Sequence, residues 1–214
     1  TIAVLALFSS TAPERAFSLQ VHSFFANCAQ FMQRIKHSSP GTSAGAGIVS
    51  TSLLQWQGTL RQLEMWSSVV DYERVVGRDP QQVRALNSSI EYLVLLLTSA
   101  VHIREQANET MDQSVREQLT EVYDSCFRSL QLIADSLAQQ QLIPDSPGLL
   151  DSDELLYEIE HRGIADNQAA PAEKEALTST LLTTAQLRRW IEAIRDCQDK
   201  INAIDWNAWN RNHL

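Results

Sequence analysis

The chain has 214 residues, of which 44% are hydrophobic and 20% are charged, and it contains only 7 Gly and 6 Pro. This balance is typical of a folded soluble domain and excludes a disordered or fibrous chain. The net charge of −9 repels phosphate backbones and therefore argues against nucleic acid as a partner. We expect a single domain over residues 1–214.

The three cysteines, Cys28, Cys126 and Cys197, lie far apart and form no CxxC pair. Their number and spacing fit neither a disulfide framework nor a structural zinc site. Each falls at an apolar position of a helical pattern, which predicts a buried thiol and mildly favours a reducing compartment.

An apolar run, Ile2 to Phe8, opens the chain with no basic residue before it. This pattern differs from a secretory signal peptide, and the run is far shorter than the roughly 20 residues that cross a bilayer. Two interpretations stay open. Residues 1–10 are the stub of a membrane helix, or they pack as the first element of the core.

The segment Thr11 to Glu14 carries the signals of a helix start: an N-cap hydroxyl, a Pro in the first turn and a Glu three residues after the cap. Apolar residues then recur at steps of three and four, which predicts a long amphipathic helix. They are Phe17, Val21, Phe24, Phe25, Cys28, Phe31, Met32 and Ile35. The small residues of 38–47 predict a linker after this helix.

Three further helices are expected over 51–76, from Asp79 to about Val101, and from Asp112 to a point before Pro144. The predicted inner residues are Leu53, Trp56, Leu60, Leu63 and Val70 in the first, Val83, Leu86, Ile90, Leu93, Val94, Leu97 and Val101 in the second, and Val115, Leu119, Val122, Cys126, Leu130, Ile133 and Leu137 in the third. Because residues 92–97 are apolar nearly all round, we expect the helix that contains them to be the most buried.

Residues 144–148 predict a turn, and Asp151 predicts the start of a short helix that ends near Gly163. After a linker over 164–170, a long helix is expected over 171–203. Its apolar residues are Leu177, Leu181, Leu187, Ile191, Ile194, Ile201 and Ile204. No segment alternates with period two, so the predicted fold class is all-α, an up-and-down bundle of five to six helices.

Three motifs resemble functional sites without their structural context. The GxSxG match at Gly41–Gly45 follows a helix, whereas a nucleophile elbow follows a strand. Glu158 and His161 have the spacing of one half of a di-metal site, but no second copy exists. The glycosylation triplets at Asn87 and Asn108 fall on or beside helices. We therefore predict no catalytic, cofactor-binding or metal-binding residue, no cofactor, and no enzyme activity.

The end of the chain places Trp206 and Trp209 three residues apart, so that one helical face or turn would carry both. Paired indoles are typical of membrane interfaces, but they also cap the ends of apolar cores. Both interpretations stay open.

Taken together, the chain resembles the helical domain between the two membrane modules of FUSC family proteins, the fusaric acid resistance or aromatic acid exporter type. The resemblance rests on the apolar start, on 24–28 (FFANC), on 92–107 and on 204–209. It implies a non-catalytic soluble domain on the cytoplasmic side of a bacterial inner-membrane efflux transporter for small aromatic or toxic acids. Its partners would be transmembrane modules of the same polypeptide, with a homo-oligomer left open, and its role regulatory or assembly-related.

Two other classes fit the pattern. In an extracytoplasmic ligand-sensing bundle, Arg104 or Arg116 would pair with an anionic ligand. A free-standing helical adaptor would have no membrane modules at all.

Overall fold

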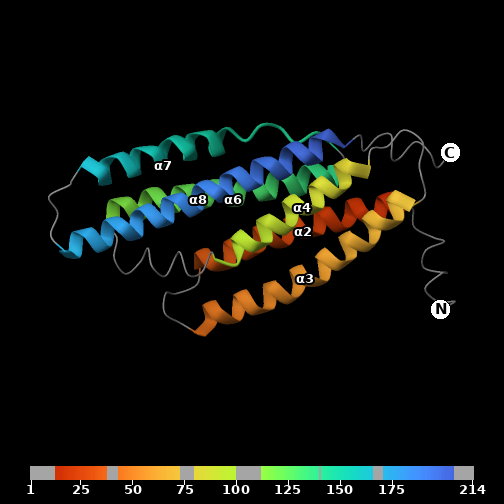
Figure 1. Cartoon of the computed structure of the whole chain (residues 1–214), viewed down its shortest axis with the longest axis horizontal. Coiled ribbons are helices and arrows are strands. Elements are labelled where there is room, and N and C mark those ends of the chain that lie inside the picture. The colour runs from red at the N-terminus through yellow and green to blue at the C-terminus, as the bar shows by residue number, and fades with distance from the viewer. Residues whose placement is uncertain are drawn as a thin grey trace.

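The computed structural model describes residues 13–37, 43–72, 80–99, 112–139, 141–165 and 171–204, and these ranges contain helices and turns but no strand. The helices are α2 (Pro13–His37), α3 (Ser43–Tyr72), α4 (Pro80–Leu97), α6 (Gln113–Gln139), α7 (Pro147–Ala165) and α8 (Pro171–Ala203). They lie along one long axis, and each runs opposite to the one before it (Figure 1). The prediction of an all-α, up-and-down helical bundle is confirmed.

Two parallel helices, α6 and α8, form the centre of the bundle. On one side α7 packs against both of them. On the other side α2 packs against α6 and α4 packs against α8, while α3 contacts both α2 and α4. The contacts from α2 to α6, α8, α4, α3 and back to α2 therefore close a ring of helices. Helix α7 packs outside this ring, on α6 and α8.

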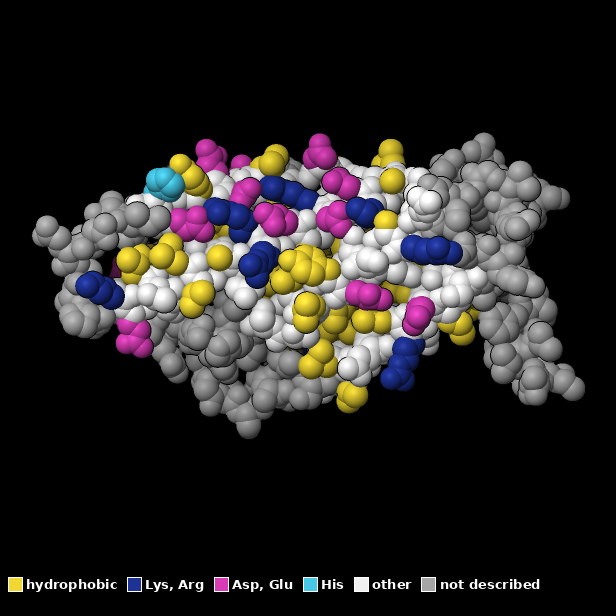
Figure 2. Space-filling view, viewed as in Figure 1, with side chains coloured by type: hydrophobic (Ala, Val, Ile, Leu, Met, Phe, Trp, Pro, Cys, Tyr) yellow, Lys and Arg dark blue, Asp and Glu magenta, His cyan; other side chains and the backbone are white. Residues whose placement is uncertain are grey.

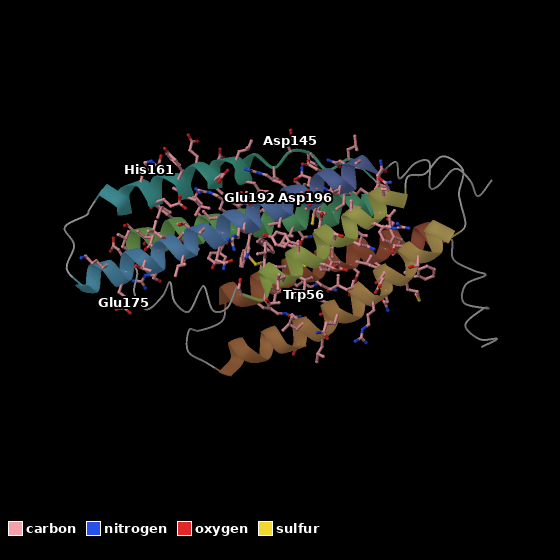
Figure 3. The ribbon with its side chains drawn as sticks, viewed as in Figure 1. Trp56, Asp145, His161, Glu175, Glu192 and Asp196 are labelled. Carbon is pink, nitrogen blue, oxygen red and sulfur yellow. The ribbon has the colours of Figure 1, made fainter. Side chains whose placement is uncertain are left out.

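The predicted apolar stripe of α2 is confirmed as core. Its described members are all buried, and they are Phe17, Val21, Phe24, Phe25, Cys28, Phe31 and Met32. The rings of Phe31 and Trp56 meet edge to face with centroids 4.7 Å apart, which fixes α3 against α2. Figure 3 shows Trp56 between these two helices.

Trp190 of α8 joins three helices. Its ring meets Tyr123 of α6 edge to face at a centroid distance of 5.6 Å, and its Nε1–H donates to the Leu96 carbonyl of α4 over 3.2 Å. The side chain is fully buried. The apolar periodicity of α8 alone did not single this residue out, because its partners come from distant parts of the chain.

Two predicted boundaries need correction. Helix α3 begins at Ser43, so residues 43–47 of the predicted linker are helical. Helix α7 begins at Pro147, four residues before the predicted start at Asp151. Proline fits the first turn of a helix because its missing N–H would have no partner there, so Pro147 starts α7 instead of belonging to a turn.

Helix α4 is among the most heavily buried of the described helices, but its apolar run over 92–97 is not buried on every side. Tyr92 is 46% exposed and Leu95 is 66% exposed, although their neighbours Leu93 and Leu97 are fully buried. A continuous apolar run does not reveal which of its residues meet partners, and here α3 and α8 cover only part of the helix surface.

The apolar start, the Trp206 and Trp209 pair, and residues 166–170 of the predicted second linker lie outside the described residues. Among the described helices, none is both long enough and apolar enough to cross a membrane.

One leucine pair on α3 tests the packing of the core. Leu63 is 1% exposed and Leu54 is 72% exposed. We expect Leu63→Ala to lower the free energy of unfolding by about 2–5 kcal/mol, because it leaves a cavity in the core. Leu54→Ala is the matched control and should change it by less than about 0.5 kcal/mol. Urea unfolding followed by circular dichroism measures both, and equal effects would contradict this packing.

Candidate functional site

A cluster of charged side chains fastens α7 to α8. Arg188 donates to Asp153 at 3.3 Å and to Glu160 at 3.1 Å, and Arg195 lies 3.5 Å from the second oxygen of Asp153. Arg195 also donates to the Leu149 carbonyl over 2.8 Å. Because these groups are partly exposed, each pair contributes at most about 1 kcal/mol, and the cluster acts mainly by fixing how α7 lies on α8.

A close backbone approach fastens the first turn of α7 to α6. The hydroxyls of Ser125 and Ser152 both donate to the Gly148 carbonyl, each over 2.6 Å. A Cβ at position 148 would lie 2.7 Å from the Ser125 oxygen, so this approach requires glycine.

The connection from α6 to α7 is tied to the end of α8. Asn202 accepts from the amide of Ile143 and donates to its carbonyl, both over 2.9 Å. Gln198 donates to the Pro144 carbonyl over 2.8 Å. The backbone groups of the α6–α7 connection have no helical hydrogen-bond partners, and these amide side chains supply them. The role of Asn202 and Gln198 is therefore structural.

A smaller polar cluster joins α4 to α8. Asp196 accepts hydrogen bonds from Ser89 of α4 and from Lys200, the latter over 2.8 Å. Partial burial acts to raise the pKa of Asp196, but the hydrogen bonds from Lys200 and Ser89 outweigh it and hold that pKa below its ordinary value. Asp196 lies on the side of α8 that faces α4 (Figure 3).

All three thiols are free and buried, as predicted. Burial raises the pKa of Cys126 to about 12 and raises the pKa values of Cys28 and Cys197 above their ordinary range. A buried, protonated thiol is a poor nucleophile and a poor metal ligand.

The Glu158 and His161 motif lies on α7, where His161 is exposed and its ring lies against Tyr157 with centroids 3.9 Å apart. Figure 3 shows His161 at the outer side of the bundle. Across the residues that the structure describes, no group of three or more His, Cys, Asp or Glu side chains could hold a metal ion.

The other motifs have a helical context. The described part of the GxSxG match, from Ser43 onward, forms the first turn of α3, while Gly41 and Thr42 lie outside the described residues. Asn87 lies within α4 and is half-buried, and Ser89 of the same triplet is buried against Asp196. Asn108 and Arg104 lie outside the described residues.

One face of the bundle carries exposed apolar side chains. Tyr92 and Leu95 are exposed on α4, and Leu54 and Met65 are exposed on the neighbouring α3. Figure 2 shows hydrophobic side chains gathered midway along the face over which these two helices run. Sequence reasoning missed this surface, because it had assigned the apolar run of α4 to the core.

Comparisons with protein-family models, with curated proteins and with solved structures found no match to this chain. The resemblance to FUSC domains therefore stays a prediction from the sequence pattern.

The lowered pKa of Asp196 predicts a dependence of stability on pH. A lowered folded-state pKa stabilises the fold above the ordinary value of 3.8, and the contribution is lost as the pH falls through the folded-state value. Asp196→Asn should therefore cost up to about 1 kcal/mol at pH 7 and progressively less toward pH 3. Glu192→Gln on the exposed side of α8 is the control. Urea unfolding at several pH values measures the difference, and a cost that does not vary with pH would contradict the assignment.

The buried thiols predict a second result. Ellman's reagent should label none of Cys28, Cys126 and Cys197 rapidly in the folded protein, and should label all three in denaturing urea, because burial keeps the thiols protonated and inaccessible. Rapid labelling of any thiol before unfolding would show that its helix pairing differs from this structure.

Proposed function

We propose that this chain is a non-catalytic helical domain of a bacterial inner-membrane efflux transporter for small aromatic or toxic acids, similar to the FUSC family. Its place is the cytoplasmic side, and its role is assembly or regulation. One observation carries this proposal: the first residue of α2 and the last residue of α8 lie at the same end of the bundle (Figure 1). A domain between two membrane modules must leave and re-enter the membrane on one side, and this arrangement suits it.

The polar contacts of the described residues support a structural role. The ion pairs of Arg188 and Arg195 join α7 to α8, and the hydrogen bond from Ser89 to Asp196 joins α4 to α8. These side chains hold helices in register, which fits a domain that transmits or fixes positions and performs no chemistry.

The exposed apolar face of α3 and α4 is the proposed contact with the transmembrane modules of the same polypeptide, or with a second copy in a homo-oligomer. A cluster of exposed apolar side chains often marks an interaction surface. Tyr92 and Leu95, one helical turn apart on α4, form its centre.

The first experiment reads the coding sequence on both sides of residues 1–214 and counts segments of roughly 20 apolar residues. Several segments on each side are expected for an inserted transporter domain. A single segment on one side would instead indicate the sensing bundle. An intact open reading frame without any such segment would indicate the adaptor.

The second experiment measures efflux of 4-hydroxybenzoate from bacteria that lack their own aromatic acid exporters and express the full-length gene. We expect efflux with the unchanged protein and a loss of at least fivefold with Leu95→Asp, because a carboxylate at an apolar contact must be desolvated. Leu182→Asp is the control, since Leu182 is 57% exposed and belongs to α8, not to α3 or α4. Equal efflux from Leu95→Asp and the unchanged protein would overturn the assigned surface. No efflux from the unchanged protein would overturn the proposed transport role.

A further inference from the structure

The buried face of α8 changes its chemical character at Leu187. After this point its fully buried residues are apolar, and they include Trp190, Ile191 and Ile194. Before it, the buried positions are held by Thr180, Thr183 and Thr184. Threonine at three buried positions of one helix indicates a polar interior at this end of α8.

Two hydroxyls in this polar stretch lack a partner. Thr180 and Thr184 donate back to carbonyls of their own helix, over 2.9 and 3.0 Å. By contrast, the Thr183 and Ser179 hydroxyl oxygens are buried and have no hydrogen-bond partner among the described residues, and Thr183 is only 1% exposed. Buried polar groups are nearly always paired in native proteins, so an unpaired one calls for a ligand or water.

The register of α6 against α8 brings an arginine to the same level. The two helices run parallel and contact each other, and Tyr123 meets Trp190. Arg116 and Thr183 each lie seven residues before these rings. Seven residues make about two turns of a helix. Arg116 therefore lies on the same face of α6 as Tyr123, and Thr183 on the same face of α8 as Trp190, each about two turns nearer the start of its helix.

Arg116 is partly buried, and one of its guanidinium donors lacks an acceptor. Its Nε is buried without a hydrogen bond, and Arg116 takes part in none of the ion pairs between described residues. A guanidinium stays charged at any pH a protein experiences, and a buried N–H of this charged group without an acceptor is costly. Arg188, by contrast, is paired with two carboxylates.

The acidic group near Arg116 is occupied elsewhere. Asp112 is exposed, and its two oxygens accept from the Ser114 hydroxyl and the Gln113 amide, both over 2.8 Å. These hydrogen bonds hold the pKa of Asp112 below its ordinary value, and the charge of Arg116 contributes least. Asp112 therefore forms no direct ion pair with Arg116 among the described residues, although the two charges attract each other.

We propose that the α6–α8 interface binds a small oxyanion, a carboxylate or a phosphate, between Arg116 and Thr183. Arg116 donates its Nε–H to one oxygen of the anion, and Thr183 donates its hydroxyl, with Ser179 one turn away as a second hydroxyl donor. Charged donors favour an anion over water at such a position. This inference does not depend on the proposed transport role, since it rests on groups within the bundle.

Isothermal titration calorimetry of the purified protein with acetate, benzoate and inorganic phosphate, at constant ionic strength in sodium chloride, tests the site. We expect saturable one-to-one binding of at least one of these anions. Its Kd should rise at least tenfold in Arg116→Met and about threefold or more in Thr183→Val, because each variant removes one donor. Arg128→Met, at an exposed position of the same helix, is the matched control and should leave Kd within about twofold.

The three probes also separate the sources of the anion. Binding of phosphate alone indicates an inorganic ligand, and tighter binding of benzoate than of acetate indicates that an aromatic carboxylate fits. Absence of saturable binding with all three, or unchanged binding in Arg116→Met, overturns the proposal. If circular dichroism shows that Arg116→Met is unfolded, Thr183→Val decides by the same titration. A protein that binds the anion but supports no efflux keeps this site and loses the proposed transport role.

Discussion

The arrangement of the bundle depends on the burial of Trp190 where α4, α6 and α8 meet. A large indole without solvent exposure must find both apolar neighbours and an acceptor for its N–H. Tyr123 supplies an aromatic ring in edge-to-face contact, and Leu96 supplies the carbonyl. These two contacts set the level of α8 against α6 and against the end of α4. The position of Ser89 beside Asp196 follows from the same register.

Polar contacts then decide how the remaining parts attach to this centre. Helix α7 buries few large side chains, and Leu149, Leu156 and Ile159 are its described core residues. Its position is fixed instead by the approach of Gly148 to α6 and by the arginines of α8. Surface ion pairs add little stability. Several of them on one helix nevertheless disfavour shifted registers of α7 along α8, which apolar packing alone would allow. The structural use of these charges is consistent with a domain whose proposed role is assembly or regulation.

The sequence predicted most of the fold and little of the candidate site. The periodicity of α2 identified its core residues, because a helix that buries one face repeats apolar residues at steps of three and four. In α8 the same periodicity missed Trp190, and the predicted Leu177 and Leu181 are only partly buried. The same method failed in α4, where Tyr92 and Leu95 belong to an apolar run but face outward. It also placed the start of α7 too late, since Pro147 and Gly148 were assigned to a turn. In α4 the missing information was which neighbouring helix lies opposite, whereas in α7 the proline was read as a turn residue although it also fits the first turn of a helix.

By itself, the sequence determined the helical class, the alternating direction of helices joined by short connections, the buried state of the three thiols, and most inward faces. These properties follow from local periodicity and composition, which each segment carries alone. Only the tertiary structure decided that Arg188 and Arg195 meet Asp153, and that Asp196 meets Ser89. Such pairings join residues tens of positions apart, and their choice depends on the helix register that packing of side chains such as Trp190 fixes.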